Sequence, residues 1–338
     1  MIHLRIVAPP DRAERALEML KAAPAACNVI SLPGTAHSPS GDVILCDVVR
    51  EEASVILGDL RELEIDRYGS IAIEDIDTEL SETARRASRA APGTRSDAVV
   101  WEEVESRTQE TAALSASFMV FMVLATLIAS VGIYLDTPIL IIGAMVVGPE
   151  FGPLAGLCVA IVQRRRTLAL RSAAALATGF PVAIAVAIVV SLLFRATGVT
   201  PDHFDSGDHS LSKIIASPDF FALFVALCAG VAGMLSLSTA KSGALIGVLI
   251  SVTTIPAAAN ISVSVAYGDW SACRGSAEQL AINLGAIVAA GVLTLSIQRA
   301  SFRRRQGDHR DDQARAAAGL PAATAGEPHP AVSEALER

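Results

Sequence analysis

The sequence predicts an α-helical, multi-pass membrane protein with a small α+β domain at its N-terminus. Hydrophobic residues make up 52% of the 338 residues and charged residues 18%, whereas soluble domains average about 45–50% and about 25%. The mean hydropathy is +0.48. The charges are also segregated, because long uncharged runs follow one another between Glu110 and Arg299. Each run is close to or longer than the roughly 20 residues that cross a bilayer.

These uncharged runs predict six transmembrane helices in a domain over residues 112–299. The run between Asp136 and Arg164 is interrupted only by Glu150. The N-terminus has no basic stretch followed by an apolar core, so we expect no cleaved signal peptide. The predicted helices cover residues 113–134, 138–162, 168–194, 218–238, 243–267 and 277–298.

Residues 1–78 predict a ferredoxin-like domain with the element order β-α-β-β-α-β. Alternating apolar residues indicate the strands, and apolar residues three and four apart indicate the helices. A turn-rich stretch, residues 33–42, separates the second strand from the third. We expect this domain either to bind an effector or to pack and assemble subunits, and we expect a homo-oligomer. The strands are 3–9, 27–32, 42–49 and 68–76, and the helices are 11–23 and 51–63.

Two polar segments flank the membrane domain. Residues 79–111 predict a linker and then a short amphipathic helix that contains Trp101. This tryptophan fits either the lipid headgroup level or the surface of the soluble domain. Residues 300–338 predict a basic and then disordered tail, because Ala, Pro, Asp and Arg dominate from about Gln306.

The basic connections predict that both termini are cytoplasmic. Residues 163–166 read QRRR, Lys241 joins the fourth and fifth predicted helices, and residues 299–305 read RASFRRR. All three lie on the same side of a six-helix arrangement, and basic loops stay in the cytoplasm. The location we expect is therefore the inner membrane of a bacterium.

Composition argues against several other classes. The net charge of −8 argues against a nucleic-acid partner. The five cysteines have no paired spacing, so we predict no disulfide framework and no zinc site. Paired carboxylates and nucleophile–base arrangements are absent from the predicted helices, so we expect neither an enzyme nor a cofactor. The cysteines are Cys27, Cys46, Cys158, Cys228 and Cys273.

The second predicted helix contains its own interruption. Residues 140–161 read LIIGAMVVGPEFGPLAGLCVAI, with a carboxylate among helix breakers. A break frees backbone groups that lipid cannot satisfy, so it is tolerated only against protein or a water-filled cavity. A charge at mid-membrane costs roughly 2.5–3.5 kcal/mol, so such residues usually face the bundle interior or water. The residues of this interruption are Gly148, Pro149, Glu150, Gly152 and Pro153.

A shift of about 104 residues predicts an internal repeat. It places the first three predicted helices on the last three, and Ile142 and Gly143 on Ile246 and Gly247. Such identities in apolar sequence also arise by chance, but the common spacing of three helices favours a repeat. Two copies of three helices must be inverted relative to each other, as in many transporters. In the second copy the polar and helix-breaking residues are Thr253, Thr254, Pro256 and Asn260.

These features predict a transporter or channel for a small solute or ion, with a midplane site where the second and fifth helices break. The alternative is a membrane scaffold or sensor whose soluble domain binds an effector or partner. In that case the prolines and glycines serve helix packing, and Glu150 lies in packed protein or near a membrane face.

The loop over residues 202–209 is rich in His and Asp. Mixed His and Asp ligands fit a divalent cation, but Asp, Ser, Gly and Pro are also typical of solvated turns. Both interpretations remain open from the sequence. The residues are Asp202, His203, Asp205, Asp208 and His209.

The sequence resembles a bacterial family of membrane proteins known as the uncharacterised hydrophobic domain family. The resemblance rests on LIIGAMVVGPEFGPLAGL at 140–157, QRRR at 163–166 and ALIGVLISVTTIPAAAN at 244–260, and it covers about residues 110–300. It implies a multi-pass inner-membrane protein and no particular activity. The usual family motif has an apolar residue where this chain has Glu150, so a role for the carboxylate would be specific to this branch.

Overall fold

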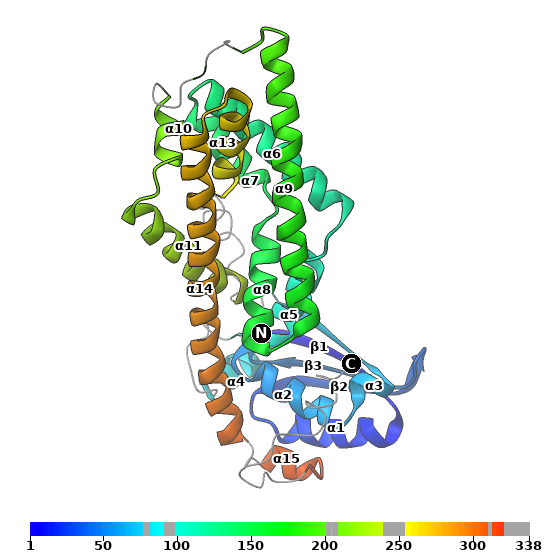
Figure 1. Ribbon diagram of the computed structural model, residues 1–338. Coiled ribbons are helices and arrows are strands. Elements are labelled where there is room, and N and C mark those ends of the chain that lie inside the picture. The colour runs from blue at the N-terminus through cyan, green and yellow to red at the C-terminus, as the bar shows by residue number, and fades with distance from the viewer. Residues whose placement is uncertain are drawn as a thin grey trace. The chain divides into compact units, whose positions relative to one another are not determined.

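The computed structural model describes residues 1–76, 81–90, 99–200, 204, 209–238, 254–309 and 313–320, with the side chains of 90, 304–309 and 313 excepted. The chain divides into two compact units. The N-terminal unit comprises Met1–Val104 and Gln298–Arg338, and the helical unit comprises Glu105–Ile297. Helices dominate the described residues (Figure 1).

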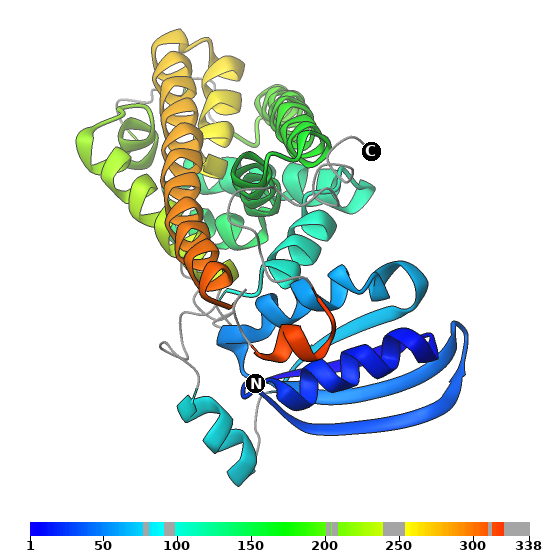
Figure 2. The ribbon, with the colours of Figure 1, turned by 90° about the horizontal axis from the view of Figure 1, so that it is seen from below.

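The N-terminal unit contains an antiparallel sheet of four strands in the order β2-β3-β1-β4. The element order β1-α1-β2-β3-α2-β4 is the one that the sequence predicts, with a one-turn helix, α3, inserted before β4. Helices α1 and α2 lie on the same face of the sheet (Figure 2). The bounds are β1 Ile2–Ala8, α1 Pro10–Ala22, β2 Ala26–His37, β3 Ser40–Val48, α2 Arg50–Glu62, α3 Ile65–Tyr68 and β4 Ser70–Asp75.

Alternation along β1 shows why this sheet has one buried face. Ile2, Leu4 and Ile6 are fully buried, whereas the residues between them are less covered. Successive side chains of a strand point to opposite faces, so a period of two fills one core. The turn prediction for residues 33–42 is wrong in its length. Strand β2 runs to His37 and β3 begins at Ser40, so a tight hairpin replaces the long turn.

The end of the chain joins the core of the N-terminal unit. The prediction of a disordered tail is wrong for residues 313–320, which include helix α15 (Gln313–Ala317). Ala314, Ala318 and Leu320 are buried in the same apolar cluster as β1, α1 and α2. The Nε of Arg15 donates a hydrogen bond to the carbonyl of Ala318 at 2.9 Å. Residues 321–338 lie outside the described part of the chain.

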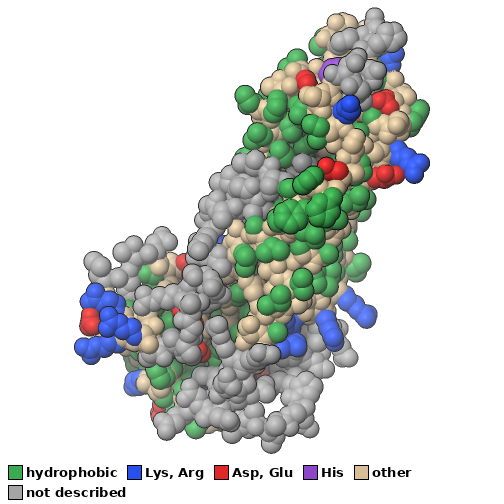
Figure 3. All heavy atoms as spheres, turned by 90° about the vertical axis from the view of Figure 1, so that its left-hand side faces the viewer, with side chains coloured by type: hydrophobic (Ala, Val, Ile, Leu, Met, Phe, Trp, Pro, Cys, Tyr) green, Lys and Arg blue, Asp and Glu red, His purple; other side chains and the backbone are tan. Residues whose placement is uncertain are grey.

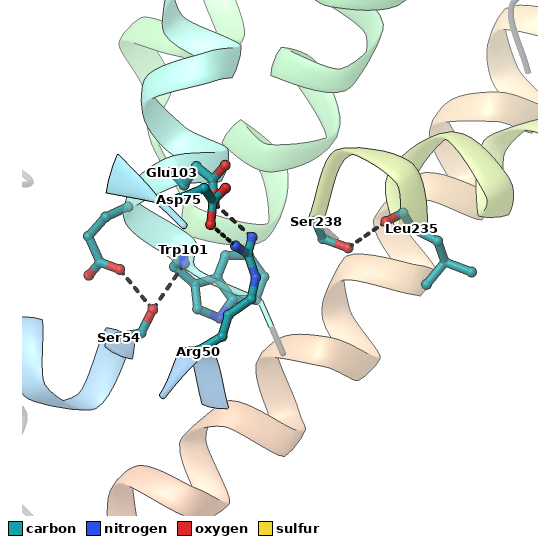
Figure 4. A network of polar contacts seen from close by, with 8 residues as sticks. Arg50, Ser54, Asp75, Trp101, Glu103, Leu235 and Ser238 are labelled. Carbon is teal, nitrogen blue, oxygen red and sulfur yellow. Dashed lines mark hydrogen bonds and ion pairs between the residues drawn. The ribbon is translucent and has the colours of Figure 1, made fainter. Parts of the chain in front are cut away.

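Trp101 packs within the N-terminal unit, which favours the second of its two predicted locations. It begins α5 (Trp101–Thr111) and is 8% exposed, with its ring 6.5 Å from that of Phe302. Its backbone N–H donates to the hydroxyl of Ser54 at 3.1 Å (Figure 4). In the same network, Arg50 bonds Glu103 at 2.8 Å and also pairs with Asp75. Helix α4 (Glu82–Ala90) packs against β2.

The helical unit contains long apolar helices, as expected of a membrane protein. Four described helices are long and apolar enough to cross a bilayer, or five if the bent pair α7 and α8 is one span. The structure therefore confirms several apolar helices of membrane-spanning length, but not the predicted number of six spans. Most of the first half of the fifth predicted span lies outside the described residues. The bounds are α6 Ala116–Tyr134, α7 Pro138–Val147, α8 Phe151–Gln163, α9 Arg166–Ala196, α10 Ser210–Ile215, α11 Phe220–Ser238, α13 Thr254–Tyr267 and α14 Trp270–His309.

Local sequence explains where these helices begin and approach one another. The hydroxyl of Ser115 caps α6 by accepting from the N–H of Phe118 at 3.1 Å. Gly230 of α11 lies against α14, where a Cβ would be 2.7 Å from the carbonyl oxygen of Ile287. Small residues let membrane helices approach this closely. At its end, α11 turns the hydroxyl of Ser238 back to the carbonyl of Leu235 at 3.2 Å (Figure 4).

The outer surface of the helical unit is apolar over a large area. Hydrophobic side chains spread over one of its faces (Figure 3). On α11, Phe220, Phe221 and Phe224 are 71%, 72% and 55% exposed. A surface of this kind is stable in contact with acyl chains but not with water.

Asp136, in the connection between α6 and α7, forms hydrogen bonds to the start of α10. Its carboxylate accepts from the hydroxyl of Ser210 at 2.6 Å and from the N–H of Leu211 at 3.0 Å. These two bonds satisfy the start of α10, as an N-cap residue does. The hydrogen bond from Ser210, followed by that from Leu211, lowers the pKa of Asp136 below its usual value.

We expect α10 to loosen in acid because of Asp136. A carboxyl whose pKa is lowered in the folded state stabilises the fold above its unfolded pKa, about 3.9, and this stabilisation is lost as pH falls through the folded value. Hydrogen exchange of the α10 amides, corrected for the intrinsic pH dependence, should therefore rise below about pH 4. In Asp136→Asn the same amides should exchange faster at neutral pH and show no such transition. Equal protection in both proteins across the series would contradict the cap.

Candidate functional site

The break that the sequence predicts at Gly148 to Glu150 is present. Helices α7 and α8 are bent by 51° at a break of three residues, Gly148 to Glu150. Pro149 has no N–H, so the carbonyl of Met145, four residues earlier, has no helical donor. The C-terminal end of α7, which is the negative end of its dipole, and the N-terminal end of α8 therefore meet at this point. Gly148 and Glu150 are buried, and Pro149 is half-buried.

Glu150 bonds a residue from the second half of the helical unit. The hydroxyl of Thr254, the first residue of α13, donates to Oε1 of Glu150 at 2.7 Å. Glu150 is 2% exposed and Thr254 is fully buried. The structure thus brings together two of the predicted site residues that are 104 positions apart in the chain.

The second carboxylate oxygen is buried without a hydrogen-bond partner among the described residues. This atom is Oε2 of Glu150. A Cβ added at Gly148 would lie 2.4 Å from it and 2.8 Å from the Cγ1 of Ile255. Gly148 therefore leaves the room in which this oxygen sits, and any larger residue there would displace the carboxylate.

Two other predicted residues shape the start of α8 and α13. A Cβ at Gly152 would lie 2.7 Å from the carbonyl oxygen of Thr111, so this glycine lets α8 approach the end of α5. Pro153 and Pro256 are buried in the first turns of α8 and α13. Both prolines occupy positions where a missing N–H costs no helical hydrogen bond. Thr253, which the sequence also predicts at the site, lies outside the described residues.

Asn260 lies at a separate cluster further along α13. Six residues separate it from Thr254, which is about 9 Å of helix. Its Oδ1 accepts from the hydroxyl of Ser212 at 2.7 Å, and its Nδ2 donates to Oγ of Ser276 at 2.8 Å and to the carbonyl of Ser212 at 3.3 Å. All three residues are fully buried. Asn260 is thus buried in the helical unit, and its hydrogen bonds go to Ser212 and Ser276 rather than to Glu150 or Thr254.

The sequence analysis missed a polar face on α14. Ser276, Gln279 and Asn283 are buried, and spacings of three and four residues place them on one side of a helix. The Nε2 of Gln279 donates to Oδ1 of Asn283 at 3.0 Å, whereas its Oε1 has no hydrogen-bond partner among the described residues. The signal was available, because these three polar residues recur with helical spacing in an otherwise apolar span.

The acidic loop gives no support for a metal site in its described part. His209 stacks on Phe204 with ring centroids 4.1 Å apart. No group of three or more potential His, Cys, Asp or Glu ligands occurs among the described residues. The other predicted ligands, Asp202, His203, Asp205 and Asp208, lie outside them.

Several apolar helices, one of them bent at a buried carboxylate, and an antiparallel four-stranded domain define the class as a helical membrane protein. Residues 145–289 match the family described as "Domain of unknown function (DUF389)". This match includes Glu150, Thr254 and Asn260, and it confirms the resemblance over that part of the chain.

An uncharacterized protein from the archaeon Methanocaldococcus jannaschii is similar to part of this chain. It is 30% identical over 197 residues, which are 56% of this chain and 58% of that protein. The chain thus spans somewhat more than half the length of this relative. The likeness reaches beyond bacteria, to which the sequence resemblance pointed. No solved structure matches the chain.

Proposed function

We propose that this protein carries a small solute or ion across the membrane through the break between α7 and α8. The observation that supports this most is Glu150, a carboxylate that is 2% exposed and bonded to Thr254 from the other half of the helical unit. An ionisable residue within a membrane domain is usually functional and often marks a transport path, and non-helical backbone within a membrane is tolerated only where it is buried in protein or lines a water-filled cavity.

The helix bounds support the inverted repeat on which this proposal draws. Helices α6 and α11 begin 104 residues apart, at Ala116 and Phe220, and each has 19 residues. Helices α9 and α14 also begin 104 residues apart, at Arg166 and Trp270, and they run in opposite directions (Figure 1). Glu150 and Thr254 then occupy the same position in the two copies.

Contact between equivalent residues has a consequence for mechanism. In an inverted repeat, equivalent residues can touch only close to the pseudo-two-fold axis, and transporter sites lie at that interface near the midplane. The Glu150–Thr254 bond therefore supports a site that both copies share. Rocking of one copy against the other would expose such a site to each side in turn. In this proposal the chain has the six spans that the sequence predicts.

The surroundings of this site follow from the same proposal. The basic turn at Arg164, Arg165 and Arg166 supports a cytoplasmic location for that end of the helical unit, and hence for both termini. The membrane would be the inner membrane of a bacterium. The N-terminal unit would regulate transport or assemble a homo-oligomer, with no role in binding nucleic acid.

Water accessibility separates this proposal from a scaffold, which can keep the break dry. We expect Thr254→Cys to react with a small, charged thiol reagent in membranes, with the reaction followed on its peptide by mass spectrometry. Val120→Cys provides the control, since residue 120 is 55% exposed on the apolar surface of α6 and should face lipid. Reaction at position 254 but not at 120 supports a path. Protection of position 254 from both sides of the membrane would favour the scaffold.

A further inference from the structure

Glu150 is an acidic side chain that is buried in the helical unit without a basic partner among the described residues. Among its described residues, Glu150 is the one buried side chain that belongs to the acidic or basic types. Its bond from Thr254 is a hydrogen bond from a neutral hydroxyl and supplies no positive charge. A buried charge is stable only when it is paired, coordinated or neutralised. The described residues therefore supply no basic side chain that pairs with Glu150.

Several oxygen atoms occur at the break and at the start of α13. Oε2 of Glu150 has no hydrogen-bond partner among the described residues, Thr254 contributes a hydroxyl, and Pro149 deprives the carbonyl of Met145 of its helical donor. The negative end of the α7 dipole and the positive end of the α8 dipole both meet at this break. Carboxylate, hydroxyl and carbonyl oxygens are the ligands of hard cations, and unwound carbonyls coordinate such ions in transporters.

The polar face of α14 extends from the Asn260 cluster toward the level of Thr254. Helices α13 and α14 run antiparallel, and the bond from Asn260 to Ser276 fixes their register. Thr254 lies six residues before Asn260 on α13, and Asn283 lies seven residues after Ser276 on α14. Measured along the helix axes, both are therefore about 9–11 Å from that bond, in the same direction. Gln279 lies between Ser276 and Asn283 on the same face of α14. Its buried Oε1 has no hydrogen-bond partner among the described residues.

The geometry points to a binding site for one monovalent alkali cation at Glu150 and Thr254, with Gln279 and Asn283 as further polar lining. One carboxylate neutralises one positive charge. Divalent ions usually take more than one carboxylate, and no group of three His, Cys, Asp or Glu ligands occurs among the described residues. An anion would be repelled by the negative charge of the carboxylate. This inference rests on the proposed function, in which the bound cation would be either the transported ion or the coupling ion.

Direct binding tests this site without requiring transport. Full-length protein in detergent is titrated with radioactive Na⁺ or with Rb⁺, as a substitute for K⁺, against a choline background. We expect saturable binding of one cation per chain. Glu150→Gln should weaken it at least tenfold, and Thr254→Val and Gln279→Leu several-fold each. Ser130→Ala provides the matched control, since it removes a buried hydroxyl from α6 whose bond is to its own helix.

The outcomes distinguish this inference from the proposed function. Binding that is lost in Glu150→Gln and kept in Ser130→Ala supports the site. Absence of alkali-cation binding to folded wild-type protein overturns it, and so does equal affinity in Glu150→Gln or tighter binding of Ca²⁺. Cation binding in a protein that shows no flux would support the site and refute transport. Flux without cation binding would do the reverse.

Discussion

Replacing Arg315 with alanine should open the N-terminal unit far more often than in the wild type. Arg315 is 7% exposed and forms ion pairs with Asp59, which is 2% exposed, and with Glu62 at 2.6 Å. Removing one member of a buried ion pair typically costs about 3–5 kcal/mol. This residue also fixes α15, whose neighbours Ala314 and Ala318 belong to the core of this unit. We therefore expect opening to become at least about 100-fold more frequent, at about 1.4 kcal/mol for each factor of ten.

The thiol of Cys46 reports this opening. Cys46 is fully buried on β3, and burial, followed by the charge of Asp47, raises its pKa to about 12. Because the thiolate is the reactive form, alkylation at neutral pH requires the unit to open. The rate is measured on the full-length protein by mass spectrometry of the peptide that contains Cys46.

Two variants make the interpretation specific. Arg85→Ala removes an exposed ion pair with Glu82 in the same unit, and exposed pairs contribute about 0–1 kcal/mol, so labelling should stay near the wild-type rate. Asp59→Asn combined with Arg315→Ala should cost less than the two single changes together, because the pair is then absent from both sides. A wild-type rate in Arg315→Ala would show that α15 does not stabilise the unit.

Local patterns predicted the parts of the fold that depend on neighbouring residues. The alternation of Ile2, Leu4 and Ile6 is sufficient to identify β1, and turn residues separate the other elements. The interruption at Gly148, Pro149 and Glu150 could be read directly, because proline and glycine act on their own helix. The predicted length of β2 was too short, because β2 continues through residues with weak strand preference and pairs there with β3.

Contacts between distant residues were harder to predict. Arg315 lies in a stretch whose composition is typical of disorder, and its partner Asp59 is 256 positions away. Ser212 bonds Asn260 through an element that the sequence places in a loop. In contrast, the bond between Glu150 and Thr254 joins residues 104 positions apart, which equals the offset of the predicted repeat. The sequence pattern places both residues at one predicted site, but the repeat was not used to pair them.

Glu150 also raises a question about the family. The residues matched to the family include this position, and the resemblance drawn from the sequence implies an apolar residue there in the usual family motif. On that expectation, the carboxylate is particular to this chain. If other members of the family share the break but lack the carboxylate, then the break forms the site, and the carboxylate determines which solute or ion the site binds.

The most direct test of the account is ion flux into proteoliposomes that contain the wild type or Glu150→Gln. This change keeps the size of the side chain and removes its negative charge, so the break and its packing should persist. Uptake of Na⁺ and Rb⁺ is followed with radioactive tracers, and proton movement is followed with a pH-sensitive dye, over a series of external pH values. Ser130→Ala serves as the control for a buried polar change elsewhere in the helical unit.

We predict cation flux in the wild type and in Ser130→Ala, and a loss of at least tenfold in Glu150→Gln across the pH series. Such a loss would place the carboxylate in the path of the ion. Equal flux in all three proteins would contradict the role of Glu150. Absence of any alkali-cation or proton flux in folded wild-type protein would contradict cation transport itself.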